Sequence, residues 1–325
     1  MRKNEERMGE KNTEYSIIIP VYKSGEWINE LVSRIGVAMD SVAPGAFELI
    51  LVNDCSPDVI TWPAIKRNAE KHPWVRGFDL LYNVGQNRAI MCGLNQARGR
   101  FVLTMDDDLQ HVPEELPKLI RAMREDEEVL CVMGRFDTKQ HHVFRNVGSW
   151  FYQKVINFVY GKPANIQTTS FRIMRKDLAG AILSCRTAKP QISPLIISMT
   201  DKIKNIPIQH TSRIQGRSGY GPANLVKTTL ENIINASTFP LRLFSVAGFF
   251  SAAVSMLLAV LFFLRWLTGG IGVAGFTTQI LLIIFFGGMT LAGIGVLGEY
   301  VARIISEITG PEQFRIKNDT ERRHE

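Results

Sequence analysis

Two long stretches without a charged residue restrict this chain more than any other feature of its sequence. Residues 243–264 contain none, and residues 267–298, which follow Arg265 and Trp266, contain none either. In a helix, about 20 apolar residues at about 1.5 Å per residue cross the roughly 30 Å hydrocarbon layer of a bilayer. We therefore expect a hairpin of two transmembrane helices near residues 243–264 and 276–297. The alternative is a pair of helices buried in a protein core.

The Lys and Arg residues around these stretches predict the orientation of the chain. The loop between them carries only Arg265, whereas cations precede the first stretch and follow the second (Lys227, Arg242, Arg303, Arg315, Lys317, Arg322 and Arg323). Segments rich in Lys and Arg stay on the cytoplasmic side. We expect a multi-pass protein of the inner (plasma) membrane, with a cytoplasmic domain at residues 14–235, a transmembrane domain at 236–310 and a cytoplasmic tail at 311–325.

The net charge indicates which classes of partner the chain can bind, and the cysteines indicate the redox state of its compartment. The formal net charge of +7 fits an anionic membrane surface or phosphorylated substrates. We expect no nucleic-acid partner, because no basic stripe is interleaved with stacking aromatic residues. The four cysteines lack metal-type spacing, which fits a reduced compartment. Residues 1–13 lack the apolar core of a signal peptide, and we expect them and the last dozen residues to be disordered.

Short apolar runs alternate with helical patterns through residues 15–134. The expected strands are 15–21, 47–53, 75–81, 100–105 and 129–134, and the expected helices are 26–39, 64–71, 86–97 and 113–124. This alternation is typical of a Rossmann-like α/β domain, in which helices cover a mainly parallel sheet. Ligands bind beyond the carboxyl ends of such strands. Asp54 and the acidic residues 106–108, which end two of the strands, are therefore expected to face one crevice.

The strand expected at residues 100–105 runs directly into three consecutive carboxylates. If the chain stays extended there, Asp106 and Asp108 lie on one face. Two carboxylates so placed can hold Mg²⁺ or Mn²⁺, which prefer oxygen ligands, and bridge the ion to a diphosphate. The alternative is a solvated acidic turn after a strand.

Five motifs in order carry a resemblance to a known family. They are Ile19-Pro-Val-Tyr22, Val52-Asn-Asp-Cys-Ser-Pro-Asp58, Asn83-Val-Gly-Gln-Asn-Arg-Ala-Ile-Met91, Met105-Asp-Asp-Asp-Leu-Gln110 and Arg213-Ile-Gln-Gly-Arg-Ser-Gly-Tyr220. With two spans behind them, the chain resembles the family 2 glycosyltransferases over nearly its whole length, and within them the polyprenyl-phosphate glycosyltransferases. The resemblance implies a nucleotide-sugar-binding domain of the GT-A type, a UDP-sugar donor and a polyprenyl-phosphate acceptor such as undecaprenyl phosphate.

The same resemblance assigns the first motifs to the donor. Asp54 can accept a hydrogen bond from the uracil N–H, and the residues flanking the ring would be Pro20, Val21 and Tyr22. The alternative for Asp54 is a turn-forming residue. Gly85 precedes a helix whose free backbone N–H groups would face the phosphates or the sugar. Alternatively, this segment only caps the helix.

The resemblance also assigns the metal and the leaving group. Asp106 and Asp108 would hold the ion together with Gln110, as in the resembled family, while Asp107 would lie beside the ribose or sugar. Arg213 would clamp the departing diphosphate, since a guanidinium binds such groups through two hydrogen bonds. The loop that closes over the donor would contain Gly216, Ser218 and Tyr220. Asp106, Asp108 and Arg213 are thus the expected catalytic residues.

For the acceptor phosphate, the resemblance nominates Arg135, Arg145 and Ser149. They lie close to an aromatic segment at residues 141–160, which reads either as an amphipathic helix at the membrane interface or as an ordinary helix packed on the sheet.

The chain departs from the family pattern at three positions. Ser24 and Asn53 replace usual acidic residues, and Gln167 stands near the place of an Asp proposed as a base in relatives. A phosphate monoester with a second pKa near ~6 is already mostly ionised at neutral pH and attacks without giving up a proton. The missing base therefore favours a lipid-phosphate acceptor, and no general base is assigned.

We expect an inverting, metal-dependent transfer of a sugar from a nucleotide donor to a polyprenyl phosphate, for modification of a cell-envelope glycan. The alternatives are a processive polysaccharide synthase and a catalytically silent membrane sensor of sugar nucleotides. A homo-oligomer such as a tetramer also stays open, because small residues would let helices approach closely within the hairpin or between subunits (Gly287, Gly288, Ala292, Gly293 and Gly295).

Overall fold

The computed structural model describes residues 13–136, 166–185, 187, 190–209, 275–309 and 312–321, with isolated positions between 246 and 264. The chain forms two compact units. The first comprises Met1–Val147, Lys162–Ser218 and Pro311–Glu325, and the second comprises Gly148–Gly161 and Gly219–Gly310.

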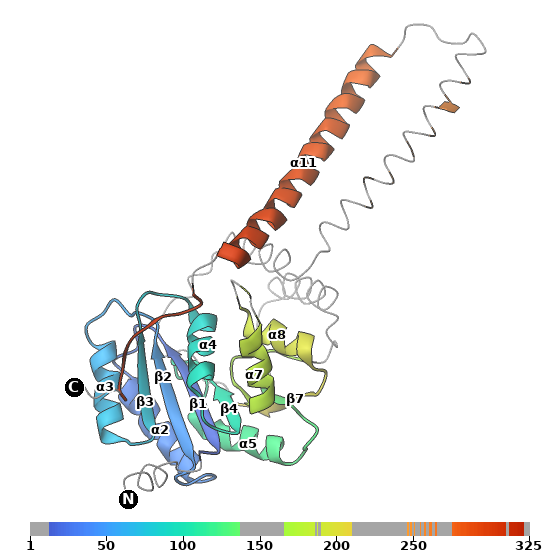
Figure 1. The fold of residues 1–325 in the computed structure, drawn as a ribbon. Helices are drawn as coiled ribbons and strands as arrows, with labels where there is room; N and C mark the ends of the chain where they lie inside the picture. The colour runs from blue at the N-terminus through green and yellow to red at the C-terminus, as the bar shows by residue number, and fades with distance from the viewer. Residues whose placement is uncertain are drawn as a thin grey trace, which may run out of the picture. The chain divides into compact units, whose positions relative to one another are not determined.

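One eight-stranded sheet organises the first unit (Figure 1). Its strand order is β7-β5-β6-β4-β1-β2-β3-β8. The strands are β1 (Tyr15–Val21), β2 (Phe47–Asn53), β3 (Val75–Leu80), β4 (Phe101–Thr104), β5 (Cys131–Phe136), β6 (Arg172–Arg175), β7 (Ile203–Ile208) and β8 (Ile316–Asp319). Strands β1 to β4 pair in parallel, as expected. β6 runs antiparallel to β4 and β5, and β8 runs antiparallel to β3, so the sheet is mixed beyond its first four strands.

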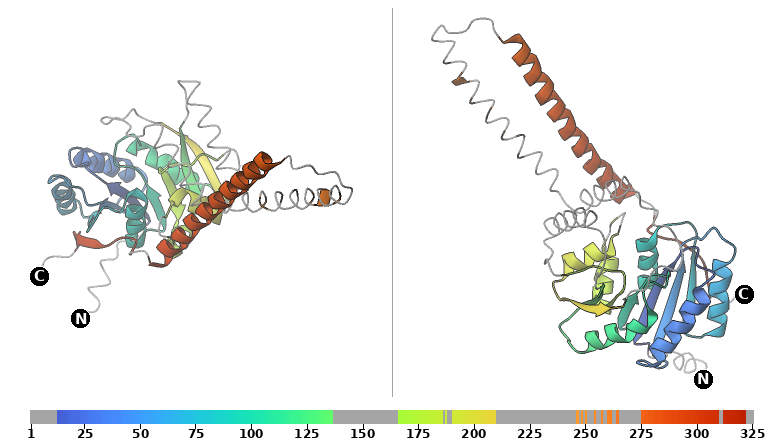
Figure 2. Two further views of the ribbon diagram at one scale, coloured as in Figure 1. Left: turned by 90° about the horizontal axis from the view of Figure 1, so that it is seen from above. Right: turned by 180° about the vertical axis from the view of Figure 1, so that it is seen from behind.

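Helices cover both faces of this sheet (Figures 1 and 2). They are α2 (Ile28–Asp40), α3 (Thr61–Lys71), α4 (Gln86–Gln96), the 3₁₀ turn η1 (Pro113–Glu115), α5 (Leu116–Arg124), α7 (Lys176–Ser184) and α8 (Ile192–Met199). Alternate residues of β1 point to opposite faces: Ile17 and Ile19 pack with α2, α3 and α5, whereas Ile18 packs with α4. Because both faces are covered, β1, β2 and β3 are buried at every position instead of alternating between buried and exposed residues.

The C-terminal residues correct one expectation, because the described part of the expected disordered tail is ordered. Residues Ile316–Asp319 form β8, which pairs with β3 so that Asp319 lies opposite Phe78. The Leu81 N–H donates to the Arg315 carbonyl at 2.8 Å, and the Thr320 N–H donates to the Gly77 carbonyl at 3.0 Å. After the apolar stretches, the chain thus returns to the sheet of the first unit and covers its β3 edge.

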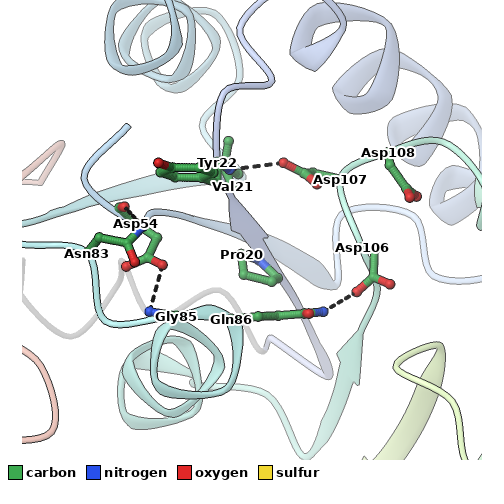
Figure 3. Close-up of a pocket in the computed structure, with 10 residues that line it drawn as sticks. All are labelled: Pro20, Val21, Tyr22, Asp54, Asn83, Gly85, Gln86, Asp106, Asp107 and Asp108. Atoms are coloured by element: carbon green, nitrogen blue, oxygen red, sulfur yellow. Dashed lines mark hydrogen bonds between the residues drawn. The ribbon is translucent and has the colours of Figure 1, made fainter. Parts of the chain in front are cut away.

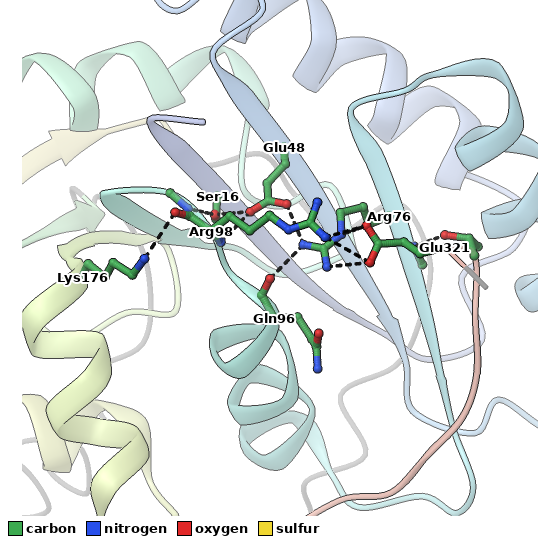
Figure 4. Close-up of polar contacts among 10 residues, drawn as sticks. Ser16, Glu48, Arg76, Gln96, Arg98, Lys176 and Glu321 are labelled. Carbon is green, nitrogen blue, oxygen red and sulfur yellow. Dashed lines mark hydrogen bonds and ion pairs between the residues drawn. The ribbon is translucent and has the colours of Figure 1, made fainter. Parts of the chain in front are cut away.

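A buried polar network secures this edge (Figure 4). The Glu48 carboxylate accepts from Ser16 Oγ at 2.6 Å and from the Arg98 N–H at 2.8 Å. Its other oxygen lies 2.7 Å from the Arg76 guanidinium, and both side chains are less than a tenth exposed. Arg76 Nε lies 2.8 Å from Glu321, just beyond β8. Residues separated by more than 200 positions in the sequence therefore share one ion-pair network.

The second unit contains one long described helix, α11 (Phe276–Thr309). It begins where the second span was expected and continues past residue 297. Its window Phe285–Ala302 has a mean hydropathy of 1.3, and none of it is buried inside the structure. Within the described residues this is the one helix long and apolar enough to cross a membrane. The first expected span lies outside the described residues apart from isolated positions, so the structure supports one span and does not support the multi-pass hairpin.

Candidate functional site

A pocket of about 410 Å³ opens beyond the carboxyl ends of β1, β2 and β4 (Figure 3). The pocket is lined by residues at the ends of these strands and at the start of α4. They are Pro20, Val21, Tyr22, Asp54, Asn83, Gly85, Gln86, Asp106, Asp107 and Asp108. The expectation that these strand ends face one crevice is confirmed, and it follows from the parallel arrangement of the strands.

The backbone around this pocket is strained at three positions. Lys23, Cys55 and Leu109 have φ angles of 59°, 50° and 58°, and they are the non-glycine residues with positive φ in the described part of the chain. Each directly follows a pocket-lining residue beyond β1, β2 or β4. Left-handed backbone costs a non-glycine residue about 1–2 kcal/mol, and such strain clusters at functional sites. The fold therefore holds these three strand ends in an unfavourable conformation around one pocket.

Asp54 organises the loop Asn83–Gly85 at the pocket. Its two carboxylate oxygens accept from the backbone N–H groups of Val84 at 2.7 Å and Gly85 at 2.8 Å, and its carbonyl accepts from the Asn83 side chain at 3.0 Å. Burial raises the pKa of Asp54, and the two N–H groups act in the opposite direction. The N–H groups that the sequence left free for the donor are thus engaged by Asp54 at Val84 and Gly85. Gly85 has a φ of 85° and a ψ of 156°, a conformation open mainly to glycine.

The middle carboxylate of the acidic triplet points away from its two neighbours. Asp107 accepts from the Tyr22 N–H at 3.1 Å and from the Ser24 hydroxyl, and its carbonyl accepts from Trp27 Nε1 at 2.6 Å. The pKa of Asp107 is raised to about 6, chiefly by burial and also by the flanking carboxylates, against the opposing effect of its hydrogen bonds. Asp107 lines the pocket and also ties the β4 end to the loop after β1.

Asp106 is held by three contacts from different parts of the chain. Its carboxylate accepts from Gln86 Nε2 at 2.6 Å (Figure 3) and from Ser170 Oγ at 2.7 Å. Its N–H donates to Nδ1 of His111 at 3.1 Å. The Asp108 carboxylate accepts from the Gln110 N–H at 3.2 Å. These contacts set the direction of the Asp106 carboxylate and leave each of its oxygens a second lone pair.

The chemistry of Asp106 and Asp108 fits a hard divalent cation, because both offer carboxylate oxygens to the pocket. Gln110, the third expected ligand, is not among the residues that line the pocket, and its backbone N–H donates to Asp108. Within the described residues there is no group of three or more His, Cys, Asp or Glu side chains that could hold a metal ion. An ion between the two carboxylates would therefore need further ligands from outside this pair.

Two further positions singled out by the sequence, Arg135 and Gln167, are described by the structure but do not line this pocket. Arg135 lies exposed on β5. Gln167 is also exposed, and its backbone is held by two hydrogen bonds to the Asn205 side chain. The remaining expected residues and the aromatic segment 141–160 lie outside the described residues: Arg145, Ser149, Arg213, Gly216, Ser218 and Tyr220.

Sequence reasoning did not assign Gln86, Ser170 or His111, although each contacts Asp106. Two of these had a signal: Gln86 opens the helix after Gly85, and His111 directly follows Gln110 in the acidic motif. Ser170 had none, because its contact with Asp106 joins residues 64 positions apart.

Comparison with known proteins places the chain in a family. The family model described as glycosyl transferase family 2 matches residues 16–183. The chain is 32% identical over 308 residues to an undecaprenyl-phosphate 4-deoxy-4-formamido-L-arabinose transferase of Edwardsiella ictaluri, covering 93% of each chain. A protein of the same name from Shewanella sediminis is 30% identical, over 93% of this chain and 91% of its own.

Among solved structures, mannosyl-3-phosphoglycerate synthase of Rubrobacter xylanophilus superimposes with a TM-score of 0.50 at 14% identity, covering 74% of this chain and 76% of that one. This likeness concerns the fold alone and agrees with a GT-A domain. Because the family model and the relatives match the segment that builds the pocket, the chain belongs to glycosyl transferase family 2 and is a glycosyltransferase.

Proposed function

We propose that this enzyme transfers a sugar from a nucleotide donor, UDP-linked, to a polyprenyl phosphate such as undecaprenyl phosphate at the cytoplasmic face of the inner membrane. The names of the relatives support a lipid-phosphate acceptor. The exposed apolar helix α11 supports a membrane location.

One observation carries the proposal: the ends of β1, β2 and β4 meet in a single pocket with an aromatic ring at one side and an acidic pair at the other. Tyr22 is 45% exposed there, so its ring is available to pack against the nucleobase of a donor. Asp54 can take the uracil N–H as a third partner, since each carboxylate oxygen accepts more than one hydrogen bond. Asp106 and Asp108 lie at the side where the diphosphate would be bound.

The proposed reaction is one inverting displacement. An oxygen of the lipid phosphate attacks the anomeric carbon, a carbon–oxygen bond forms, and the bond to the nucleoside diphosphate breaks as that group leaves with the electron pair. A divalent ion on Asp106 and Asp108 would neutralise the charge that grows on the leaving group. Arg213 would act on the same diphosphate, and Arg135, Arg145 and Ser149 would aim the attacking phosphate.

No protein base is needed in this scheme, because the attacking phosphate is already ionised near neutral pH. The exposed Gln167 agrees with this, since an amide takes no proton from an acceptor. A hydroxyl acceptor would require a base in its place.

The proposal is tested by incubating membranes that contain the protein with a panel of radiolabelled nucleotide sugars and extracting the lipid. Label should enter an acid-labile lipid fraction from one donor, and membranes with Asp108→Asn should not form it. Label that enters only a polymer, or none from any donor, would contradict the proposal.

A further inference from the structure

Arg172 is a buried cation directly beneath the acidic end of β4. It lies on β6 opposite Thr104 of β4, and the whole residue is 2% exposed. Its Nε donates to Thr104 Oγ1 at 3.1 Å and its guanidinium donates to Ser193 Oγ at 2.8 Å. Both acceptors are neutral. In the described part of the chain, no carboxylate forms a salt bridge with Arg172.

A buried guanidinium requires a compensating negative charge, because it stays protonated and leaving it uncompensated in a protein interior is costly. Burial lowers the pKa of Arg172, while Cys131 and Asp106 act in the opposite direction. Burial also raises the pKa of the Cys131 thiol to about 12, so that thiol is neutral at physiological pH. Asp106 remains as the anion that acts on Arg172.

Short polar contacts link the two charges. The Thr104 hydroxyl, which accepts from Arg172, donates to the Ser170 carbonyl at 2.6 Å. The Ser170 hydroxyl in turn donates to the Asp106 carboxylate at 2.7 Å. Asp106 is therefore connected to the buried cation through Thr104 and Ser170. The neighbouring carboxylates have other partners: Asp107 contacts the Tyr22–Ser24 loop, and Asp108 accepts from the Gln110 N–H.

We propose that Arg172 is a positioning residue that acts as the resident counter-charge of Asp106 and holds the acidic strand end in place before a divalent cation binds. Two consequences distinguish this role from ordinary packing. The Asp106 charge stabilises the fold, although acidic residues crowded in an active site usually destabilise it. Arg172 repels the cation, so its removal tightens cation binding.

The first test is made without any metal, in EDTA, and so does not rest on the proposed function. The melting temperatures of Asp106→Asn and Asp108→Asn are compared with that of the unchanged protein. Asp106→Asn leaves the buried guanidinium without its anion and should melt lower by roughly 3–6 °C, less than for a directly contacting buried pair, because Thr104 and Ser170 lie between the two charges. Asp108→Asn relieves repulsion between neighbours and should melt at the same temperature or higher. Equal shifts, or a higher melting temperature for Asp106→Asn, would overturn the proposal.

The second test measures Mn²⁺ binding in the presence of UDP by electron paramagnetic resonance and does rest on the proposed cation site. Arg172→Met should bind Mn²⁺ several-fold more tightly, because a nearby positive charge is removed. Arg172→Lys keeps the charge and should bind as the unchanged protein does. Weaker binding in Arg172→Met, as expected of a packing role, would overturn the proposal. If the unchanged protein binds no Mn²⁺, the proposed metal site is wrong, and the melting comparison still decides the role of Arg172.

Discussion

Removing the Arg76 guanidinium should destabilise the sheet edge strongly. In Arg76→Met, the Glu48 carboxylate stays buried but loses its ion-pair partner at 2.7 Å. Breaking a buried pair by deleting one partner costs about 3–5 kcal/mol. Glu48 keeps its hydrogen bonds from Ser16 and the Arg98 N–H, which favours the lower end of that range. At about 2–4 °C per kcal/mol for a domain of this size, the melting temperature should fall by roughly 6–12 °C.

The assay is thermal unfolding of the full chain in detergent, followed by circular dichroism. Glu321→Gln is the matched control, because Glu321 contacts the same guanidinium but its side chain is 40% exposed, and exposed pairs contribute at most about 1 kcal/mol. Combining Arg76→Met with Glu48→Gln should recover much of the loss, since the amide removes the uncompensated charge and keeps an oxygen for the hydrogen bonds from Ser16 and the Arg98 N–H. If Arg76→Met melts no lower than Glu321→Gln, the assignment of stability to the buried pair is refuted.

Three further outcomes are expected. Asp108→Asn should lower transfer by roughly a hundredfold, because it removes charge from the proposed ion's ligands; full activity of this variant in EDTA would contradict the metal site. Arg145→Ala should raise the Michaelis constant for polyprenyl phosphate and leave nucleotide-sugar binding by calorimetry nearly unchanged, since its expected partner is the acceptor anion; loss of donor binding instead would overturn that division of roles. Burial raises the thiol pKa of both Cys92 and Cys131 to about 12, so neither should react with a maleimide at pH 8, whereas the half-exposed Cys55 should. Mass spectrometry of the labelled chain identifies the modified cysteines. Labelling of Cys92 and Cys131 but not of Cys55 would contradict this expectation.

The central strands and the position of the pocket could be predicted because their signals are local. The expected strands 15–21 and 47–53 coincide with β1 and β2, since short, predominantly apolar runs bounded by polar residues identify strands buried on both faces. The expected helix 113–124 begins as the 3₁₀ turn η1 and continues as α5, an irregularity that hydrophobic periodicity does not reveal. The shared crevice then follows from parallel strand order alone.

Strand β8 could not be predicted from the sequence. Its four residues, Ile316–Asp319, are mostly polar and show no strand periodicity, and they are stabilised by an edge more than 200 positions away. The partners of Asp107 were hidden for a related reason. Extended geometry predicts that Asp107 points away from its two neighbours, but the contact with Tyr22 and Ser24 depends on how the β1 and β4 loops meet in space.

Whether the acceptor is a lipid phosphate is tested by a comparison of two lipids. The purified chain in liposomes is given its labelled nucleotide sugar with either undecaprenyl phosphate or undecaprenol, which differ only in the phosphate. We expect product with undecaprenyl phosphate alone, because only an ionised phosphate attacks without a protein base. Transfer to undecaprenol at a comparable rate, or no transfer to either lipid, would contradict it.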